Sequence, residues 1–492
     1  MNSVSAFTES NSSMALLTDF YQLTMAYGFW KSDMSHKEGV YHLFFRRSPF
    51  NGAFCVTAGL ESVIHYVENL KFNKSDLDYL AGIEGTDGKL LFEEEFLRYL
   101  EDMKFSCDID AIPEGTITFP FEPLIRVQGP IIQCQLLETP LLNLINFPTL
   151  IATKAARVCR AAQGDPVLEF GMRRAQGVDG ALTASRAAFI GGCNGTSNVL
   201  AGKVYDIPVK GTIAHSWVMA FEDELEAFRA YADVMPNNCV LLVDTYSTIE
   251  GVKKAVQVGK ELKQKGFELS GIRLDSGDLA YLSIEARRIL DENGLTDVKI
   301  LASNDLDETI IQSLKVQNAE IDVWGIGTKL VTAFDQPALD GVYKLSAIRD
   351  PGGHWQYKIK ISEQSVKVTT PGIQQVRRYF DHEWCIADVV YDKDTDMDHG
   401  CIMVDPFDIT RQREIPDGVE YKDLLVPVFR SGKSCYTLPP LLEIKEKTQK
   451  GLNHFHQAIR RLVNPHQYPV GNEKTLNDLK TRLTFQGRRR KS

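Results

Sequence analysis

The sequence lacks several features that define whole classes of protein. Its 492 residues carry a formal net charge of −10. The lack of a net positive charge argues against general nucleic-acid binding, which needs a basic face. Its nine cysteines include no CxxC pair, so scattered free thiols in a reducing compartment are expected, and no zinc site. The polar first thirteen residues show neither the basic start nor the apolar core of a secretory signal.

Long apolar runs are missing as well. The most hydrophobic regions are interrupted at Arg126, Glu138, Pro140 and Lys154, so no segment is expected to cross a membrane. With 43% hydrophobic and 24% charged residues, the composition is that of an ordinary globular protein, and the cytoplasm is the expected location. The length exceeds what one compact core usually holds, which predicts two domains or one elaborated barrel.

A rhythm of short apolar runs begins near residue 167. Candidate strands cover residues 167–170, 189–193, 209–215, 240–244, 271–275, 300–304 and 323–328, and helical patterns separate the later ones. One of these helical patterns is expected to run from residue 217 to 231. So many βα units predict a parallel sheet, most commonly closed into a barrel.

The flanking regions have a different character. Helices are expected over residues 14–29, 60–70 and 77–99, and short strands and proline turns lie near residues 40–46 and 112–127. The predicted fold class is α/β: an irregular (β/α) barrel with a second α+β domain built from the N-terminal region and a C-terminal extension. The expected boundaries are 1–135 for the N-terminal α+β domain, 136–348 for the barrel and 349–492 for a C-terminal domain that packs with the N-terminal region.

Polar residues and glycines follow almost every candidate strand of the barrel, where such folds place their chemistry. They are Arg173, His215, Asp244, Arg273, Asp275, Ser276, Asp278, Ser303, Asn304, Asp305, Gly325, Gly327 and Thr328, and the aromatic Phe170 stands among them. Taken singly, each has a structural explanation: Asp278 and Asp305 can cap helices, the glycines can serve a tight turn, and a lone histidine is usually packed or capping. Arginines, carboxylates and a glycine loop on one rim together favour an enzyme that handles a phosphosugar.

A basic stretch ends the apolar helix expected over residues 136–162. Lys154, Arg157 and Arg160 share one helical face by their i, i+3 spacing. Such a face can be solvated or can meet phosphate, and the sequence leaves both alternatives open.

At these strand ends the chain closely resembles the nicotinate phosphoribosyltransferases, a type II phosphoribosyltransferase family. The matching motifs occur in family order over roughly residues 15–350, at residues 17–22 (LTDFYQ), 169–174 (EFGMRR), 189–193 (FIGGC) with 195–198 (GTSN), 211–216 (GTIAHS), 244–246 (DTY), 272–278 (IRLDSGD), 303–304 (SN), 325–328 (GIGT) and 336–339 (QPAL).

The resemblance implies a reaction in which nicotinate displaces pyrophosphate from 5-phosphoribosyl 1-pyrophosphate to give nicotinate mononucleotide, the first step of NAD synthesis from nicotinate. It also implies ATP as a co-substrate, hydrolysed through a phosphohistidine at His215, and Mg²⁺ as cofactor. Nicotinate would contact Tyr21, Phe170, Thr212, Arg273 and Ser197. Tyr21 is expected to come from the neighbouring subunit, which makes the protein a homodimer with shared active sites.

The same resemblance assigns the remaining candidates. Phosphoribosyl pyrophosphate would be bound by Arg173, Asp244, Asp275, Asn304, Gly325, Gly327 and Thr328, and also by Lys154 and Arg157, which can reach into the partner's site. Asp275 and Asp244 would hold the Mg²⁺ ion, and His215, Asp275 and Arg273 form the catalytic set. Ser197 favours the acid over the amide, because the related nicotinamide-using enzyme has an aspartate there that would repel a carboxylate.

Two other interpretations remain open from the residues alone. A barrel aldolase or isomerase would need a buried Schiff-base lysine or a lone glutamate base at a strand end, and neither is clearly placed. A non-catalytic ligand sensor would have lost catalytic residues, whereas His215, Arg273 and Asp275 are all present.

Overall fold

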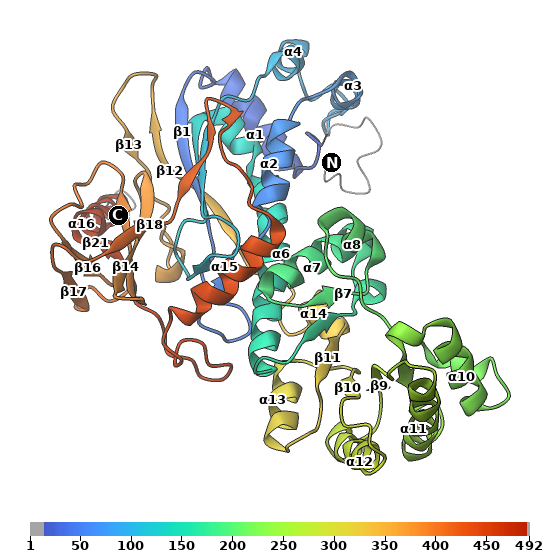
Figure 1. Cartoon of the computed structure of the whole chain (residues 1–492). Coiled ribbons are helices and arrows are strands. Elements are labelled where there is room, and N and C mark those ends of the chain that lie inside the picture. Colours follow the sequence, from blue (N-terminus) through green and yellow to red (C-terminus); the bar gives the residue numbers. More distant parts are fainter. Residues whose placement is uncertain (1–13, 490–492) are drawn as a thin grey trace. The chain divides into compact units, whose positions relative to one another are not determined.

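The computed structural model of the chain describes residues 14–489 (Figure 1). Residues 1–13, for which no secretory signal was expected, and residues 490–492 lie outside the described part. The described chain divides into two compact units. One unit comprises residues 151–337, and the other comprises residues 14–150 together with residues 338–489.

The unit of residues 151–337 is built on a six-stranded sheet in which every recorded pair of strands is parallel. The spatial order is β7-β6-β11-β10-β9-β8. The strands are β6 (Val167–Glu169), β7 (Gly195–Thr196), β8 (Val240–Leu242), β9 (Gly271–Leu274), β10 (Lys299–Ala302) and β11 (Val323–Ile326).

The pairings leave this sheet with two edges. A single parallel bridge from Thr196 to Val209 extends it beyond β7, and no pairing among the described residues joins that segment to β8. The mixed α/β class and the parallel sheet therefore agree with the sequence prediction, while closure into a barrel stays a prediction.

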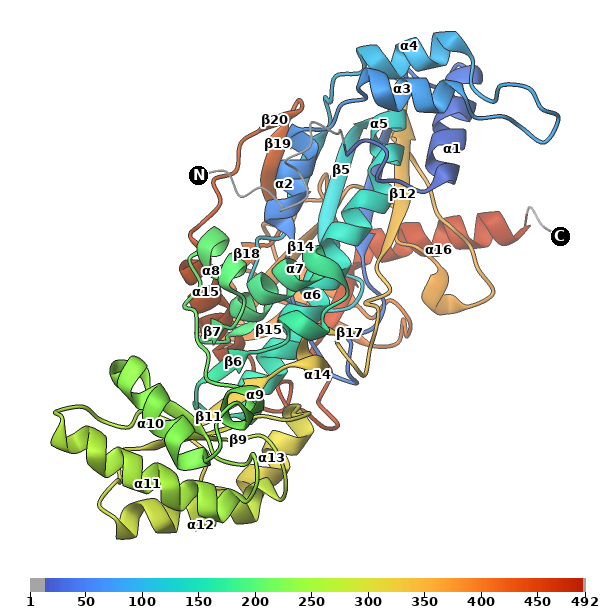
Figure 2. The same cartoon turned by 90° about the vertical axis from the view of Figure 1, so that its right-hand side faces the viewer.

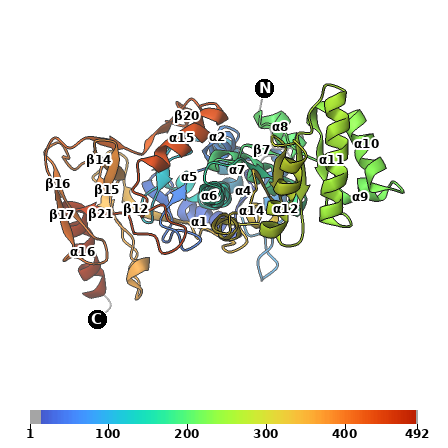
Figure 3. The ribbon, with the colours of Figure 1, turned by 60° about the horizontal axis from the view of Figure 1, so that its bottom comes forward.

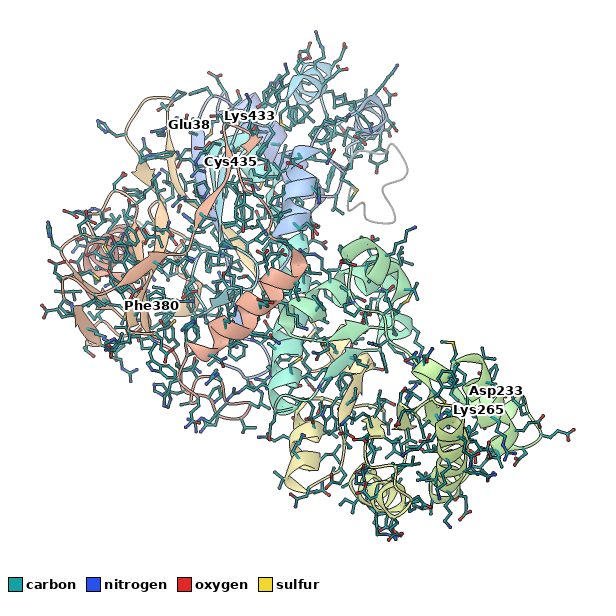
Figure 4. The ribbon with its side chains drawn as sticks, in the orientation of Figure 1. Glu38, Asp233, Lys265, Phe380, Lys433 and Cys435 are labelled. Atoms are coloured by element: carbon teal, nitrogen blue, oxygen red, sulfur yellow. The ribbon has the colours of Figure 1, made fainter. Side chains whose placement is uncertain are left out.

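Helices follow the strands of this unit, as parallel pairing requires. They are α7 (Gly177–Gly191), α8 (Val199–Tyr205), α9 (His215–Met219), α10 (Glu224–Val234), α11 (Thr248–Gln264), α12 (Leu279–Glu292), α13 (Glu308–Val316) and α14 (Thr328–Val331), with short 3-10 turns η1 (Met172–Arg174) and η2 (Pro236–Asn238). Figure 3 shows α11 between α10 and α12. Asp233 and Lys265, labelled in Figure 4, form an ion pair of 2.7 Å that joins the end of α10 to the end of α11.

Helix caps settle one alternative from the sequence and correct another. Asp278 caps α12, since its side chain accepts a hydrogen bond from the backbone N–H of Tyr281. The cap of α13 is Asp307, whose carboxylate accepts from the N–H groups of Thr309 and Ile310, so the expected cap at Asp305 is wrong.

Three expected elements in this unit are also wrong. Of residues 209–215, expected as a strand, only Val209 forms a bridge, and His215 begins α9. Residues 189–191 end helix α7 and do not form a strand. The sequence could not show this, because the periodicity of a short buried apolar run does not distinguish a helix from a strand. Gly191 lets this helix pack closely against the backbone at Ala152, since a Cβ at residue 191 would lie 2.3 Å from the carbonyl oxygen of Ala152. The helix expected over residues 217–231 is split into α9 and α10, and Asp223 caps the second part.

The second unit contains a seven-stranded sheet of order β13-β12-β1-β5-β3-β19-β20, a six-stranded sheet of order β17-β16-β21-β15-β14-β18 and a two-stranded sheet of β2 and β4. The strands are β1 (Glu38–Phe44), β2 (Cys55–Val56), β3 (Asp108–Ala111), β4 (Ile117–Thr118), β5 (Ile125–Pro130), β12 (Val342–Arg349), β13 (Gln356–Tyr357), β14 (Gln374–Asp381), β15 (Trp384–Asp392), β16 (Cys401–Val404), β17 (Gln412–Ile415), β18 (Tyr421–Asp423), β19 (Val426–Arg430), β20 (Lys433–Ser434) and β21 (Val470–Glu473). Strands from both ends of the chain therefore share one sheet, where β1 pairs with β12 and β3 with β19. The expected domain boundaries themselves stay a prediction.

Helices of this unit are α1 (Phe20–Lys31), α2 (Leu60–Glu68), α3 (Lys74–Ala81), α4 (Glu94–Asp102), α5 (Ile131–Leu136), α15 (Leu441–Asn453) and α16 (Lys474–Arg489), with a 3-10 turn η3 (Ser365–Lys367); α6 (Glu138–Ala161) runs through the boundary between the units. The single helix expected over residues 77–99 is wrong, since α3 and α4 are separate helices that lie side by side (Figure 2). A turn at Gly88, whose φ is +73°, lies between them, and this conformation favours glycine. No helix within residues 14–489 is long and apolar enough to span a bilayer.

A buried charge cluster ties the six-stranded sheet of this unit to the turn between β4 and β5. Arg378 Nε lies 2.8 Å from Asp388 Oδ1, and the Tyr468 hydroxyl donates to the same oxygen at 3.0 Å. Glu122 is fully buried beside this pair. Burial, reinforced by the negative charge of Asp388, raises the pKa of Glu122 well above its usual value.

We expect the substitution Glu122→Gln to flatten the pH dependence of stability. The folded protein keeps a proton on Glu122 that the unfolded chain releases above the ordinary glutamate pKa of about 4.3, so the free energy of unfolding falls as pH rises, by up to about 1.4 kcal/mol per pH unit. Glutamine keeps the hydrogen-bonding shape and removes this proton. Thermal unfolding between pH 5 and 8 should show a smaller loss of Tm in the variant, and equal slopes for both proteins would contradict the buried neutral carboxyl.

Candidate active site

The candidate residues Arg273, Asp275 and Ser303 lie on one of the two faces of the six-stranded sheet. Successive side chains of a strand alternate between faces, and the parallel pairs Leu301–Arg273 and Leu242–Arg273 fix the register of three neighbouring strands. The face that Arg273 shares, called the site face below, carries Leu168, Phe170, Gly195, Ser197, Leu242, Asp244, Asp275, Leu301, Ser303, Val323, Gly325 and Gly327. Residues of the opposite parity face the helices, as Glu169 does through its hydrogen bond with Ser185 of α7.

Arg273 is the centre of the polar contacts on the site face. Its guanidinium donates from Nε to Ser303 Oγ at 2.8 Å, from Nη1 to Thr212 Oγ1 at 3.0 Å and from Nη2 to Asp275 Oδ1 at 2.9 Å. The side chain is only 13% exposed. Its Cζ atom lies 5.8 Å from the centre of the Phe170 ring, so a cation is held beside an aromatic face.

Asp275 and Asp244 are linked directly. Asp244 Oδ2 accepts hydrogen bonds from the Asp275 backbone N–H and from the Ser276 hydroxyl, both at 2.7 Å. Burial of Asp275 opposes its ionisation, but the hydrogen bond from Ser303 and the charge of Arg273 outweigh burial and hold the pKa of Asp275 below its usual value. The site face thus keeps an anion at this position at neutral pH.

His215 stands at the edge of this group. It is the first residue of α9, its Nδ1 atom lies 3.2 Å from Thr245 Oγ1, and its Nε2 atom lies 3.8 Å from Asp275 Oδ2. The imidazole is 40% exposed. One ring nitrogen is therefore held by a hydroxyl, while the other faces a carboxylate and remains accessible.

The glycine motif after β11 has a packing reason. A Cβ on Gly325 would lie 2.8 Å from the Phe170 ring and 3.4 Å from the Ser303 Cβ atom, so only glycine leaves room for the aromatic side chain. Gly327 precedes Thr328, the first residue of the short helix α14. Phe170 is buried with Leu168 and Leu301, which fixes its ring on the site face.

Three further candidates lie around this face. Arg173 is exposed in η1, directly after β6, and Ser197 is half-buried, with its backbone N–H donating to the Glu169 carbonyl at 2.9 Å. Asn304 is exposed and has a φ of +110°, an unusual value for a residue other than glycine.

Lys154 and Arg157 lie in a different environment from these residues. Both side chains are buried on α6, and Glu308 is between them, 2.7 Å from Lys154 Nζ and 2.8 Å from Arg157 Nε. Asp335 adds a second carboxylate at 2.9 Å from Lys154. Their charges are thus balanced within the unit, and their burial contradicts the solvated face that the sequence left open. Contact with phosphoribosyl pyrophosphate stays a prediction.

Tyr21 belongs to the other unit. It lies on α1 with 47% of its surface exposed, and Met25, one turn later, is exposed as well. Partial burial and the nearby carboxylates of Glu138 and Asp19 raise its pKa above the usual tyrosine value. Asp19 and Gln22 hold the helix, through hydrogen bonds with Thr139 and Gln135.

Sequence reasoning missed the roles of three residues. Thr245 contacts His215 through its hydroxyl. The Lys210 backbone N–H donates to the Thr196 carbonyl at the end of β7. Glu169 is a fully buried carboxyl group on the helix side of the sheet. The alternation of faces could have separated Glu169 from Phe170. The expectation that an aldolase would show a glutamate base at a strand end is not met by Glu169, because its side chain points away from the site face.

Solved structures of similar fold place this arrangement in a class. The chain matches the crystal structure of human nicotinic acid phosphoribosyltransferase with a TM-score of 0.83 and 31% identity, covering 95% of this chain and all of that one. A nicotinate-nucleotide pyrophosphorylase from Pyrococcus furiosus shares the fold, with a TM-score of 0.68 and 23% identity over 92% of this chain and 99% of that one. The architecture is that of pyridine-nucleotide phosphoribosyltransferases.

Sequence comparisons identify the family. Family models of the nicotinate phosphoribosyltransferase (NAPRTase) N-terminal domain, the central family region and the C-terminal domain match residues 16–146, 166–382 and 373–480. The Bacillus subtilis nicotinate phosphoribosyltransferase is 44% identical over 93% of this chain and 92% of its own length, and the human enzyme is 34% identical over 92% and 94%. The chain belongs to the nicotinate phosphoribosyltransferase family.

Proposed function

We propose that the protein joins nicotinate to 5-phosphoribosyl 1-pyrophosphate, forming nicotinate mononucleotide and releasing pyrophosphate, and that ATP hydrolysis through His215 drives the reaction. In this role it converts nicotinate into a precursor for NAD synthesis. Support comes from family membership along nearly the whole chain and from the group of side chains around Arg273. The cytoplasmic location expected from the sequence stays a prediction.

The observation that carries the proposal is the way in which Arg273 is held. A guanidinium has five N–H donors, and the bonds to Ser303, Thr212 and Asp275 use three of them. The remaining two can bind the carboxylate of nicotinate, and the neighbouring Phe170 ring offers a face for the pyridine ring. Ser197, on the same face, brings no negative charge against that carboxylate.

The rest of the site face suits the phosphoribosyl group. Asp244, Asp275 and Asn304 can bind ribose hydroxyls, while Arg173 and the backbone near Gly325, Gly327 and Thr328 can meet phosphate. Transfer through a transition state with oxocarbenium character needs charge stabilisation and alignment more than it needs a strong base. The anionic Asp275 beside the ribose provides negative charge of the required sign.

The carboxylates also fit a Mg²⁺ ion. Asp244 Oδ1 is buried without a hydrogen-bond partner, whereas Oδ2 accepts two hydrogen bonds. One carboxylate oxygen is therefore left for a ligand. One or two carboxylates together with substrate phosphates make up the usual Mg²⁺ site. When bound there by Asp244 and Asp275, the ion would neutralise charge on the pyrophosphate leaving group.

We predict that nicotinate is strongly preferred over nicotinamide and that Arg273→Ala removes the preference. Losing the charge-assisted contact should cost roughly 1.5–3 kcal/mol, which is about 10- to 150-fold in kcat/KM. Product formation from nicotinate, phosphoribosyl pyrophosphate, Mg²⁺ and ATP is the measurement. Arg288→Ala on the surface of α12 is the matched control and should behave as wild type. Equal kcat/KM for acid and amide in the wild-type protein would refute the assignment.

The ATP part of the proposal rests on the position of His215. Its exposed imidazole can attack the γ-phosphate of ATP, forming an N–P bond as ADP leaves. The phosphorylated ring would bring close to two negative charges next to Asp275 and, through it, Arg273. Such a change can reorganise the rim and tighten the site for substrate.

His215→Ala should therefore keep slow synthesis without ATP but lose both ATP hydrolysis and stimulation by ATP. Incubation with γ-labelled ATP should give an acid-labile, base-stable label on the wild-type protein and none on the variant. His382→Ala, which changes a fully exposed histidine of the other unit, should keep the label. A label that persists in His215→Ala would place the coupling residue elsewhere.

We also propose a homodimer in which Tyr21 completes the partner's site. The exposed Tyr21 and Met25 give α1 an apolar surface that a second subunit can cover. Tyr21→Ala and Asp275→Ala chains should each be inactive, whereas a purified mixed dimer should recover about half of the wild-type activity, because one of its two shared sites is complete. Inactive mixed dimers of verified composition would place Tyr21 in the site of its own chain.

A further inference from the structure

Glu169 is a buried carboxyl group that the proposed reaction does not use. It ends β6, its side chain has no exposed surface, and no Lys or Arg within residues 14–489 forms an ion pair with it. The carboxylate accepts hydrogen bonds from the Gly171 backbone N–H, from the Ser185 hydroxyl at 2.9 Å and from the Thr196 hydroxyl at 2.5 Å. A buried carboxyl group is costly unless hydrogen bonds satisfy it, so its presence at this strand end needs a reason.

The donors belong to segments that carry site residues. Gly171 follows Phe170 and opens the turn that leads to Arg173, and Thr196 precedes Ser197. The main chain of Glu169 adds another link, since its carbonyl accepts from the Ser197 N–H at 2.9 Å. Through its side chain and its carbonyl, one residue therefore fixes the positions of both Phe170 and Ser197.

The network also extends to the next helix. The Asn198 backbone N–H donates to Thr196 Oγ1 at 3.0 Å, and Asn198 Nδ2 donates to Ser185 Oγ at 3.2 Å. Asn198 Oδ1 in turn caps α8 by accepting from the Ala201 N–H. The segment that carries Ser197 is thereby attached at both of its ends.

We propose that Glu169 is a positioning residue for nicotinate. This inference rests on the proposed function. It acts from the helix side of the sheet, without touching substrate, by holding the Phe170 ring and Ser197 at the spacing that the pyridine carboxylate needs. Its loss should weaken nicotinate binding while leaving the transfer step nearly intact, because Arg273, Asp275 and His215 are held by other bonds.

Asp165 offers a control just outside the same strand. It lies just before β6, at the opposite end from Glu169, and its carboxylate accepts from Trp324 Nε1 at 2.9 Å and pairs with Lys315. Both acidic residues join β6 to its surroundings, but only Glu169 is bonded to segments of the candidate site.

The experiment compares Glu169→Ala, Glu169→Gln and Asp165→Asn in Tm and in steady-state kinetics at saturating phosphoribosyl pyrophosphate. Glu169→Ala should raise the KM for nicotinate about tenfold or more, with kcat changed less than about threefold. Glu169→Gln should recover most of the KM, because its amide oxygen can accept from Gly171 and both hydroxyls can accept from its amide nitrogen. Asp165→Asn should lower Tm without changing the KM. Thr196→Val, which removes one donor, replaces Glu169→Ala if that chain does not fold, and should raise the KM in the same direction.

Two results would overturn the proposal. A lower Tm with an unchanged KM, as expected for Asp165→Asn, would make Glu169 a purely structural residue. A collapse of kcat at constant KM would place it in the transfer step. A wild-type protein that makes no nicotinate mononucleotide would instead refute the proposed function and this inference with it.

Discussion

The in-register pairing of parallel strands is the constraint on which the candidate site depends. Because each strand of the sheet alternates its side chains, a slip of one residue in any pair would move Arg273, Asp275 or Ser303 to the helix side. The buried residues of the opposite parity prevent such a slip. The register is therefore held by apolar packing, and the polar site follows from it.

Carboxylates outnumber the single arginine at the centre of the site face. Arg273 is compensated by Asp275, while Asp244 adds a further negative charge beside it. An anionic substrate alone would meet this excess of carboxylates unfavourably, whereas a magnesium complex of the pyrophosphate would not. Magnesium as cofactor stays a prediction.

The sequence predicted most of this site, because its signal is local. An apolar run followed by a polar residue identifies a strand end, and this rule found Asp244, Arg273 and Asp275. It failed at residues 189–191, where a run of small and apolar residues is the buried end of a helix. It also could not supply the partner of Lys154 and Arg157, since Glu308 lies about 150 residues further along the chain and only the folded structure brings it near.

The three bonds that hold Arg273 have a consequence for affinity. A free arginine side chain carries about 2 kcal/mol of conformational entropy that is lost when it is fixed by a ligand. Here folding has already fixed the guanidinium through Ser303, Thr212 and Asp275, so a ligand that binds it does not have to order it. A ligand with few atoms can therefore bind well, because the side chain that it contacts is already ordered before binding.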